Sequence, residues 1–143
     1  MRKLTCILIA LLVIACKKED VISDIPQIEF VSVTPTTAQE YIDDILIVIS
    51  YTDANGDLGE NNPDVFNLFV SDNRNNIEYK FRIPELSPSG SQISIEGNLN
   101  IKIKGSGITN NATSQLVNYD IYTIDRAGNS SNVITTSSIT IVQ

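Results

Sequence analysis

Short runs of alternating apolar and polar residues constrain the fold of this 143-residue chain more than any other feature. In residues 77–83 every odd position is apolar and every even position is charged, and residues 99–104 repeat the same period. Because side chains of a strand alternate between its two faces, each run predicts a strand with one buried and one wet face. Residues 45–49 are apolar throughout and predict a central strand covered on both faces.

Further strand signals follow at short intervals, separated by Asn, Asp, Gly, Ser and Pro, and no segment predicts a helix in this part. These strands are expected at residues 28–33, 65–70, 92–95, 116–124 and 134–142. About eight short strands predict an all-β fold, a single antiparallel β-sandwich of the immunoglobulin-like or fibronectin type III-like kind. A small barrel is the alternative. Tyr119 is a candidate for the corner tyrosine of such sandwiches, or else a residue that fills the core.

The first residues predict a bacterial lipoprotein signal peptide. Arg2 and Lys3 precede an apolar segment, residues 4–15, and a small residue stands before Cys16. The segment is too short to cross a bilayer core of about 30 Å, and a buried N-terminal helix is the alternative. We therefore expect cleavage before Cys16 and lipid on its sulfur. The expected organisation is a signal peptide at 1–15, a lipidated cysteine and tether at 16–25, and the sandwich at 26–143.

Charge and residue types exclude several classes of function. Removal of Arg2 and Lys3 with the leader leaves 8 of the 10 basic residues against 17 acidic ones, a net charge of −9 that disfavours nucleic acid. The chain has no histidine, so Ser-His-Asp catalysis and ordinary zinc sites are excluded. We expect no enzymatic activity. A small glycoside hydrolase with paired carboxylates is the weaker alternative.

The acidic loop, residues 53–64, is the one motif that predicts a ligand. Asp53, Asn55, Asp57 and Asp64 place oxygen side chains at the spacing of a calcium loop, which predicts a structural Ca²⁺ ion. The spacing resembles that of dockerin calcium loops, although Leu58 stands where the EF-hand pattern has glycine. The alternative is an Asx-rich turn whose carboxylates are solvated.

A second loop, residues 125–131, is expected at the same end of the sandwich. Asp125 or Asn129 would then complete the metal site, whereas Arg126 would instead neutralise the carboxylates and remove the need for metal. The first strand would begin at this end too, so the tether would leave beside the site.

With these residues in view, the chain resembles the small lipoproteins of Bacteroidota. Cys16 is followed by Lys18, Glu19 and Asp20, similar to the export signal of that phylum, and residues 51–59 and 123–131 resemble loops of bacterial immunoglobulin-like domains. The resemblance implies a protein held in the outer membrane by the lipid on Cys16 and exposed at the cell surface. We expect a non-catalytic binding or structural module with a protein or glycan partner. The alternative is a periplasm-facing accessory subunit of an uptake or adhesion complex.

Overall fold

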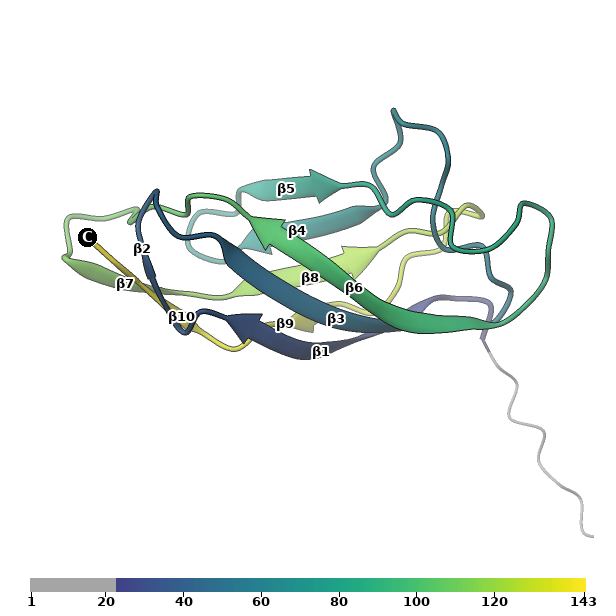
Figure 1. The fold of residues 1–143 in the computed structure, drawn as a ribbon, viewed down its shortest axis with the longest axis horizontal. Coiled ribbons are helices and arrows are strands. Elements are labelled where there is room, and N and C mark those ends of the chain that lie inside the picture. Colours follow the sequence, from purple (N-terminus) through teal and green to yellow (C-terminus); the bar gives the residue numbers. More distant parts are fainter. Residues whose placement is uncertain (1–22) are drawn as a thin grey trace, which may run out of the picture.

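The computed structural model describes residues 23–143, and all of its regular structure is β-strand (Figure 1). The expected all-β fold is therefore confirmed. The predicted signal peptide at 1–15, Cys16 and the export residues Lys18, Glu19 and Asp20 lie outside the described residues. The strands are β1 (Gln27–Thr34), β2 (Thr37–Gln39), β3 (Ile45–Asp53), β4 (Leu68–Asp72), β5 (Glu78–Phe81), β6 (Ile95–Ile103), β7 (Ser114–Val117), β8 (Tyr119–Thr123), β9 (Ile134–Thr135) and β10 (Ile139–Val142).

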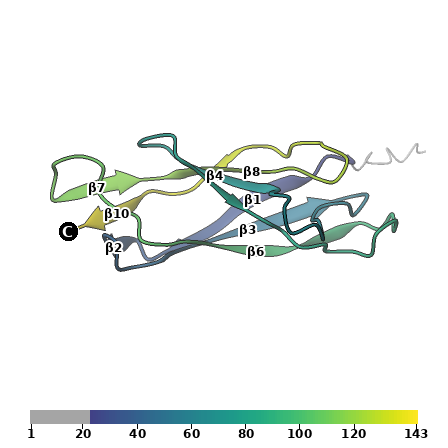
Figure 2. The same cartoon turned by 90° about the horizontal axis from the view of Figure 1, so that it is seen from above.

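These strands form three sheets in the orders β1-β3-β6, β5-β4-β8-β9 and β2-β10-β7. All pairings are antiparallel except that of β10 with β2. Only Asn118 separates β7 from β8, and only three residues separate β9 from β10. The sheet β5-β4-β8-β9 and the sheet β2-β10-β7 therefore lie end to end. Seen from above, β3 and β6 lie on one side of the molecule and β4 and β8 on the other (Figure 2). This arrangement is consistent with a β-sandwich.

The core lies between the layers and consists mainly of inward-facing aliphatic residues. From β3 come Ile45, Ile47 and Ile49, and β8 contributes Ile121; all four are fully buried. Each such side chain stabilises the fold by about 1.5–3 kcal/mol relative to an exposed one. The expectation that residues 45–49 are covered on both faces is wrong, because Leu46 is 37% exposed. Strand β3 is central within its sheet, between β1 and β6, but its other face meets solvent.

Several predicted strands have different bounds in the structure. Separate strands are expected at residues 92–95 and 99–104, but the structure has one continuous strand, β6, which takes only Ile95 from the first segment and most of the second. The segments 116–124 and 134–142 each divide into two strands, because each contributes to both of the end-to-end sheets. Strand β2 was not predicted, since three residues carry too little periodicity to be recognised.

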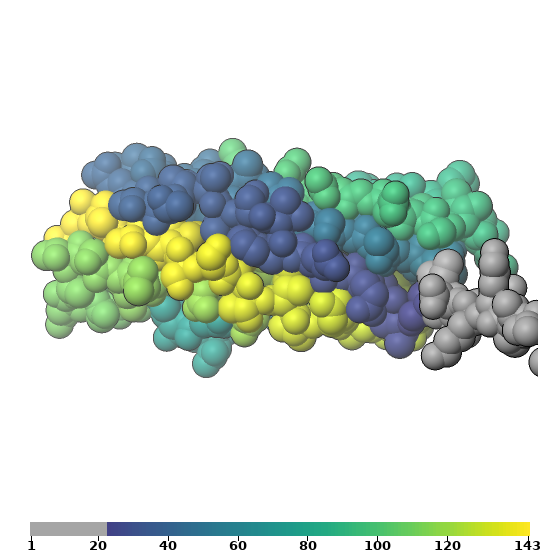
Figure 3. Space-filling model, turned by 90° about the horizontal axis from the view of Figure 1, so that it is seen from below, coloured from purple at the N-terminus to yellow at the C-terminus, as the bar shows by residue number. Residues whose placement is uncertain are grey.

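Two asparagine side chains take the place of backbone pairing. Asn67, just before β4, accepts the N–H of Ile83 at 2.6 Å and donates to its carbonyl at 3.1 Å. Asn132 forms the same pair of bonds with Ile28 of β1, each at 2.9 Å. In the space-filling view the β1 segment and the C-terminal segment run side by side along one face (Figure 3). The Asn132 contact therefore joins the two layers along the edge that β1 would otherwise leave open.

Asp72, the last residue of β4, and Arg74, in the turn to β5, form a buried ion pair. The Asp72 and Arg74 side chains are 1% and 8% exposed, and Nη2 of Arg74 lies 2.6 Å from Oδ2 of Asp72. Arg74 also donates to the carbonyl of Gly107 at 2.9 Å and to Ser106 Oγ at 3.0 Å. The fully buried Tyr119 donates its hydroxyl to the same Ser106 Oγ at 3.3 Å. Tyr119 thus fills the core, and its hydroxyl contacts the side chain of Ser106 in the β6–β7 connection. The hydroxyl of a tyrosine corner would contact the backbone instead.

The chain enters the domain at the end that carries the acidic loop. Gln27, the first residue of β1, pairs with Thr52, which immediately precedes Asp53. The C-terminus lies at the opposite end of the long axis (Figure 1). Among residues 23–143, no helix is long and apolar enough to cross a membrane.

Candidate functional site

The acidic loop turns back on itself directly after β3. Its first carboxylate, Asp53, is 1% exposed, and Oδ2 of that side chain accepts the backbone N–H of Leu58 at 2.7 Å. Leu58 is fully buried in the hydrophobic core. The carboxylate and the leucine together hold the first half of the loop against the end of the sandwich.

Two glycines allow this half of the loop to pack against the connection between β5 and β6. Gly56 has φ +71° and Gly59 has φ +94°, a region that residues with a Cβ rarely adopt. A methyl group on Gly56 would collide with the carbonyl oxygen of Ile93, and one on Gly59 with that of Pro84. Glycine is therefore required at both positions for the two loops to approach each other.

Arg126 fastens the second predicted loop to the acidic loop. Its backbone N–H donates to the carbonyl of Asp57 at 3.2 Å, and its Nη1 and Nη2 donate to the carbonyls of Gly59 at 3.0 Å and Gly56 at 3.3 Å. Its ion pair is with Glu85, at 3.5 Å. The carbonyl of Gly59, which calcium-loop spacing would offer to a metal, thus accepts the guanidinium instead.

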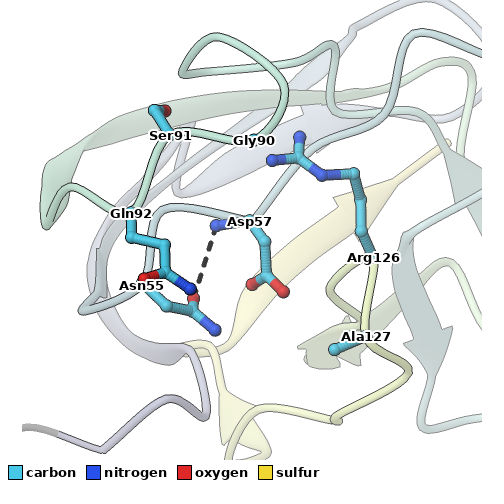
Figure 4. Close-up of a pocket in the computed structure, with 7 residues that line it drawn as sticks. All are labelled: Asn55, Asp57, Gly90, Ser91, Gln92, Arg126 and Ala127. Carbon is cyan, nitrogen blue, oxygen red and sulfur yellow. Dashed lines mark hydrogen bonds between the residues drawn. The ribbon is translucent and has the colours of Figure 1, made fainter.

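The structure brings three of the five predicted metal ligands together. Asp53, Asp57 and Asp125 lie close enough for the first and the third to act electrostatically on Asp57. Asn55 lies beside them, and its Oδ1 accepts the backbone N–H of Asp57 at 3.4 Å (Figure 4). Asp64 is exposed, and its N–H takes part in a separate Asx turn.

The surroundings of Asp57 disfavour its charged form. Burial raises the pKa of the Asp57 carboxyl above its ordinary value, and the negative charges of Asp125 and Asp53 raise it further. The positive charge of Arg126 and a backbone hydrogen bond act in the opposite direction. Asp125 has hydrogen bonds of its own, because its two oxygens accept the backbone N–H and the side-chain amide of Asn129 at 2.7 and 2.9 Å.

A shallow hollow of about 340 Å³ opens beside Asp57 and Arg126, and neither Asp53 nor Asp125 lines it. In Figure 4 the Arg126 guanidinium extends toward Gly90, whereas the Asp57 carboxylate points away from it. Arg126 therefore acts on the Asp57 carboxylate through its charge alone and forms no ion pair with it. The hollow is lined by Asn55, Asp57, Gly90, Ser91, Gln92, Arg126 and Ala127.

The described residues 23–143 contain no group of three Asp, Glu, Cys or His side chains positioned to enclose a metal ion. What the arrangement offers is two buried carboxylates, Asp53 and Asp125, and between them the partly buried carboxylate of Asp57. Oxygen atoms of this kind suit a hard cation.

Sequence reasoning missed the part that the β5–β6 connection plays. Glu85 pairs with Arg126 and accepts the side-chain amide of Asn61, and Ser87 Oγ donates to the carbonyl of Gly56. The prolines and serines of residues 84–91 indicate only a loop. Contacts between loops distant in sequence leave no local pattern that would have revealed them.

The predicted anchor and export residues add nothing to this geometry, because Cys16, Lys18, Glu19 and Asp20 lie outside the described residues. In comparisons with known proteins, no family model, no curated protein and no solved structure matches this chain. Function is therefore inferred from the residues and their geometry.

Proposed function

We propose that this protein is a lipid-anchored, non-catalytic β-sandwich module of a bacterial outer membrane, displayed at the cell surface. The observation that carries the proposal is Cys16 at the end of a short basic-apolar leader. Acylation there would attach the domain firmly, since each buried methylene contributes about 0.8 kcal/mol. Gln27 begins β1 only 11 positions after Cys16, so the tether would span at most about 40 Å.

The sandwich would be of the immunoglobulin-like or fibronectin type III-like kind. The strand orders β1-β3-β6 and β5-β4-β8-β9 support this, because each layer takes strands from distant parts of the chain, as Greek-key connections require. The switch of the N-terminal segment from β1 in one layer to β2 beside β10 in the other agrees with it.

A non-catalytic role agrees with the chemistry of the described residues. The carboxylates of the acidic-loop cluster are occupied in part by backbone hydrogen bonds, as Asp53 is by Leu58. The chain has no histidine to serve as a general base.

Orientation supports a role in binding. The tether joins the domain at the acidic-loop end, so the opposite end would face away from the membrane (Figure 1). Large apolar side chains are exposed near β2 and on β7: Tyr41 is 70% exposed, Ile42 68% and Leu116 64%. A protein or glycan partner would meet this end first.

The anchor can be tested in a bacterial host that processes lipoproteins. The wild-type chain should incorporate radiolabelled palmitate and partition into the detergent phase, and Cys16→Ser should do neither. Cys6→Ser is the matched control, because Cys6 lies within the predicted leader and should leave labelling unchanged. Equal labelling of wild type and Cys16→Ser would refute the anchor.

Surface display needs a separate measurement, protease treatment of intact cells. The surface proposal predicts loss of the domain from intact cells, and neutralising Glu19 and Asp20 together should protect it while palmitate labelling persists. Protection of the wild-type domain until the outer membrane is opened would favour the periplasm-facing accessory subunit. The outer edges of β5 and β6, each with one neighbouring strand among the described residues, would then be candidate contact edges.

A further inference from the structure

Unpartnered buried oxygens collect at the acidic-loop end of the domain. Among residues 23–143, the buried side-chain atoms without a hydrogen-bond partner are Asp53 Oδ1, Asp57 Oδ1 and Thr123 Oγ1. Asp53 ends β3 and Asp57 follows in the loop, while Thr123 ends β8, two residues before Asp125. Since a buried carboxylate oxygen without a partner is strongly destabilising, two of them at one place indicate a missing positive partner.

Backbone contacts bring the carboxylates into one cluster. Oδ2 of Asp53 accepts the N–H of Leu58, the residue after Asp57, at 2.7 Å. The N–H of Arg126, the residue after Asp125, donates to the carbonyl of Asp57 at 3.2 Å. The three residues therefore lie near one another where the end of β3, the acidic loop and the β8–β9 connection come together, close enough for Asp53 and Asp125 to act electrostatically on Asp57.

No basic side chain among the described residues pairs with this cluster. The ion pairs of residues 23–143 join Arg74 to Asp72, Lys80 to Glu78, Lys102 to Asp44 and Arg126 to Glu85. The guanidinium of Arg126, the cation beside the cluster, donates instead to Glu85 and to the carbonyls of Gly56 and Gly59. The charge of Asp53, Asp57 and Asp125 is left without a direct counter-charge.

We propose that Asp53 and Asp57 bind one Ca²⁺ ion through their free Oδ1 atoms, with Asp125 supplying further negative charge beside it. Calcium fits because every donor is a hard oxygen and because water completes its irregular shell of six to eight ligands readily. Zinc would call for imidazole or thiolate, and the described residues contain neither histidine nor cysteine. The site is smaller than the calcium-loop spacing predicts, because it leaves out exposed Asp64 and the carbonyl of Gly59.

The ion would stabilise the end of the domain at which the chain enters. Gln27 pairs with Thr52, next to Asp53, so a cation at this carboxylate would stiffen the start of β1 together with the loop. This inference is independent of the lipid anchor: the site is built from residues 53–125 alone. Its test reads calcium binding and not membrane attachment, so either proposal can fail without the other.

Thermal unfolding of the protein, purified in a neutral detergent and followed by circular dichroism, is the first test. Calcium at a hundredfold excess over its Kd should raise Tm by roughly 10 °C relative to chelator. Asp57→Asn should melt at the same temperature in calcium and in chelator. Asp64→Asn is the matched control: it removes a charge from the same loop but outside the site, and should keep the full shift.

Isothermal titration calorimetry of the wild-type protein with calcium chloride is the second test, and it does not depend on a variant that folds. One ion per chain is expected. Equal Tm values in calcium and chelator, absence of binding at millimolar calcium, or loss of the shift in Asp64→Asn as complete as in Asp57→Asn would each overturn the proposal.

Discussion

Removing the positive partner of the buried ion pair should be among the most destabilising single changes available in this domain. Arg74→Met leaves the Asp72 carboxylate, whose side chain is 1% exposed, without a counter-charge, and removes the donors that reach Ser106 and Gly107. Breaking a buried pair in this way costs about 3–5 kcal/mol, because the remaining charge stays desolvated. The hydrogen bonds that Arg74 donates to the Asp72 carboxylate raise the pKa of the guanidinium, which reflects the same coupling.

Urea unfolding followed by circular dichroism measures this loss of stability. A decrease of 3–5 kcal/mol is a large fraction of the 5–15 kcal/mol that domains usually have. Lys102→Met is the matched control, because Lys102 and Asp44 form an exposed pair at 3.1 Å and such pairs contribute at most about 1 kcal/mol.

A double variant separates buried charge from lost packing. Adding Asp72→Asn to Arg74→Met should recover part of the lost stability, since the unpaired carboxylate is then gone. A loss below about 1 kcal/mol in Arg74→Met, or no recovery in the double variant, would refute the reasoning.

Three further predictions concern the loops, the edge and the core. Gly56→Ala should destabilise the domain by more than Gly90→Ala in urea unfolding, since both have positive φ but only Gly56 meets a neighbouring backbone; equal losses would contradict this. Asn132→Ala should cost about 1–3 kcal/mol, because it orphans both backbone groups of Ile28; an unchanged midpoint would count against it. Burial raises the pKa of Tyr119, so the unfolded chain loses its proton first and stability should fall as pH rises above about 10. Tyr119→Phe should flatten that fall, and an identical pH profile would show that Tyr119 does not contribute.

The fold could be predicted from sequence where burial of one face dictates the residue pattern. The alternation persists over residues 78–83, where Ile83 is buried and Glu78, Lys80 and Arg82 are exposed, but Ile77 at the start of the run is 52% exposed. Burial on both faces at 45–49 was predicted wrongly, because an apolar side chain such as Leu46 can remain at the surface at little cost. Strand β2 escaped prediction because its three residues carry too little periodicity and its partner, β10, lies about a hundred residues further along the chain.

The acidic residues of the candidate site could be predicted from the sequence, but which of them lie together could not. Regular spacing of oxygen side chains pointed to Asp53 and Asp57, and topology, which correctly put the two loops at one end, added Asp125. The same spacing also included Asp64, which the structure leaves exposed and apart. Asp64 differs from the other three aspartates in its lack of burial against other loops. That burial depends on contacts such as that of Gly59 with Pro84, which no local pattern encodes.

The most direct test of the account as a whole is the intact mass of the protein isolated from membranes of a lipoprotein-processing host. The account predicts an amino terminus at Cys16 that carries the mass of two or three acyl chains, with residues 1–15 removed. A chain that begins at Met1 with an unmodified thiol at Cys16 would contradict it.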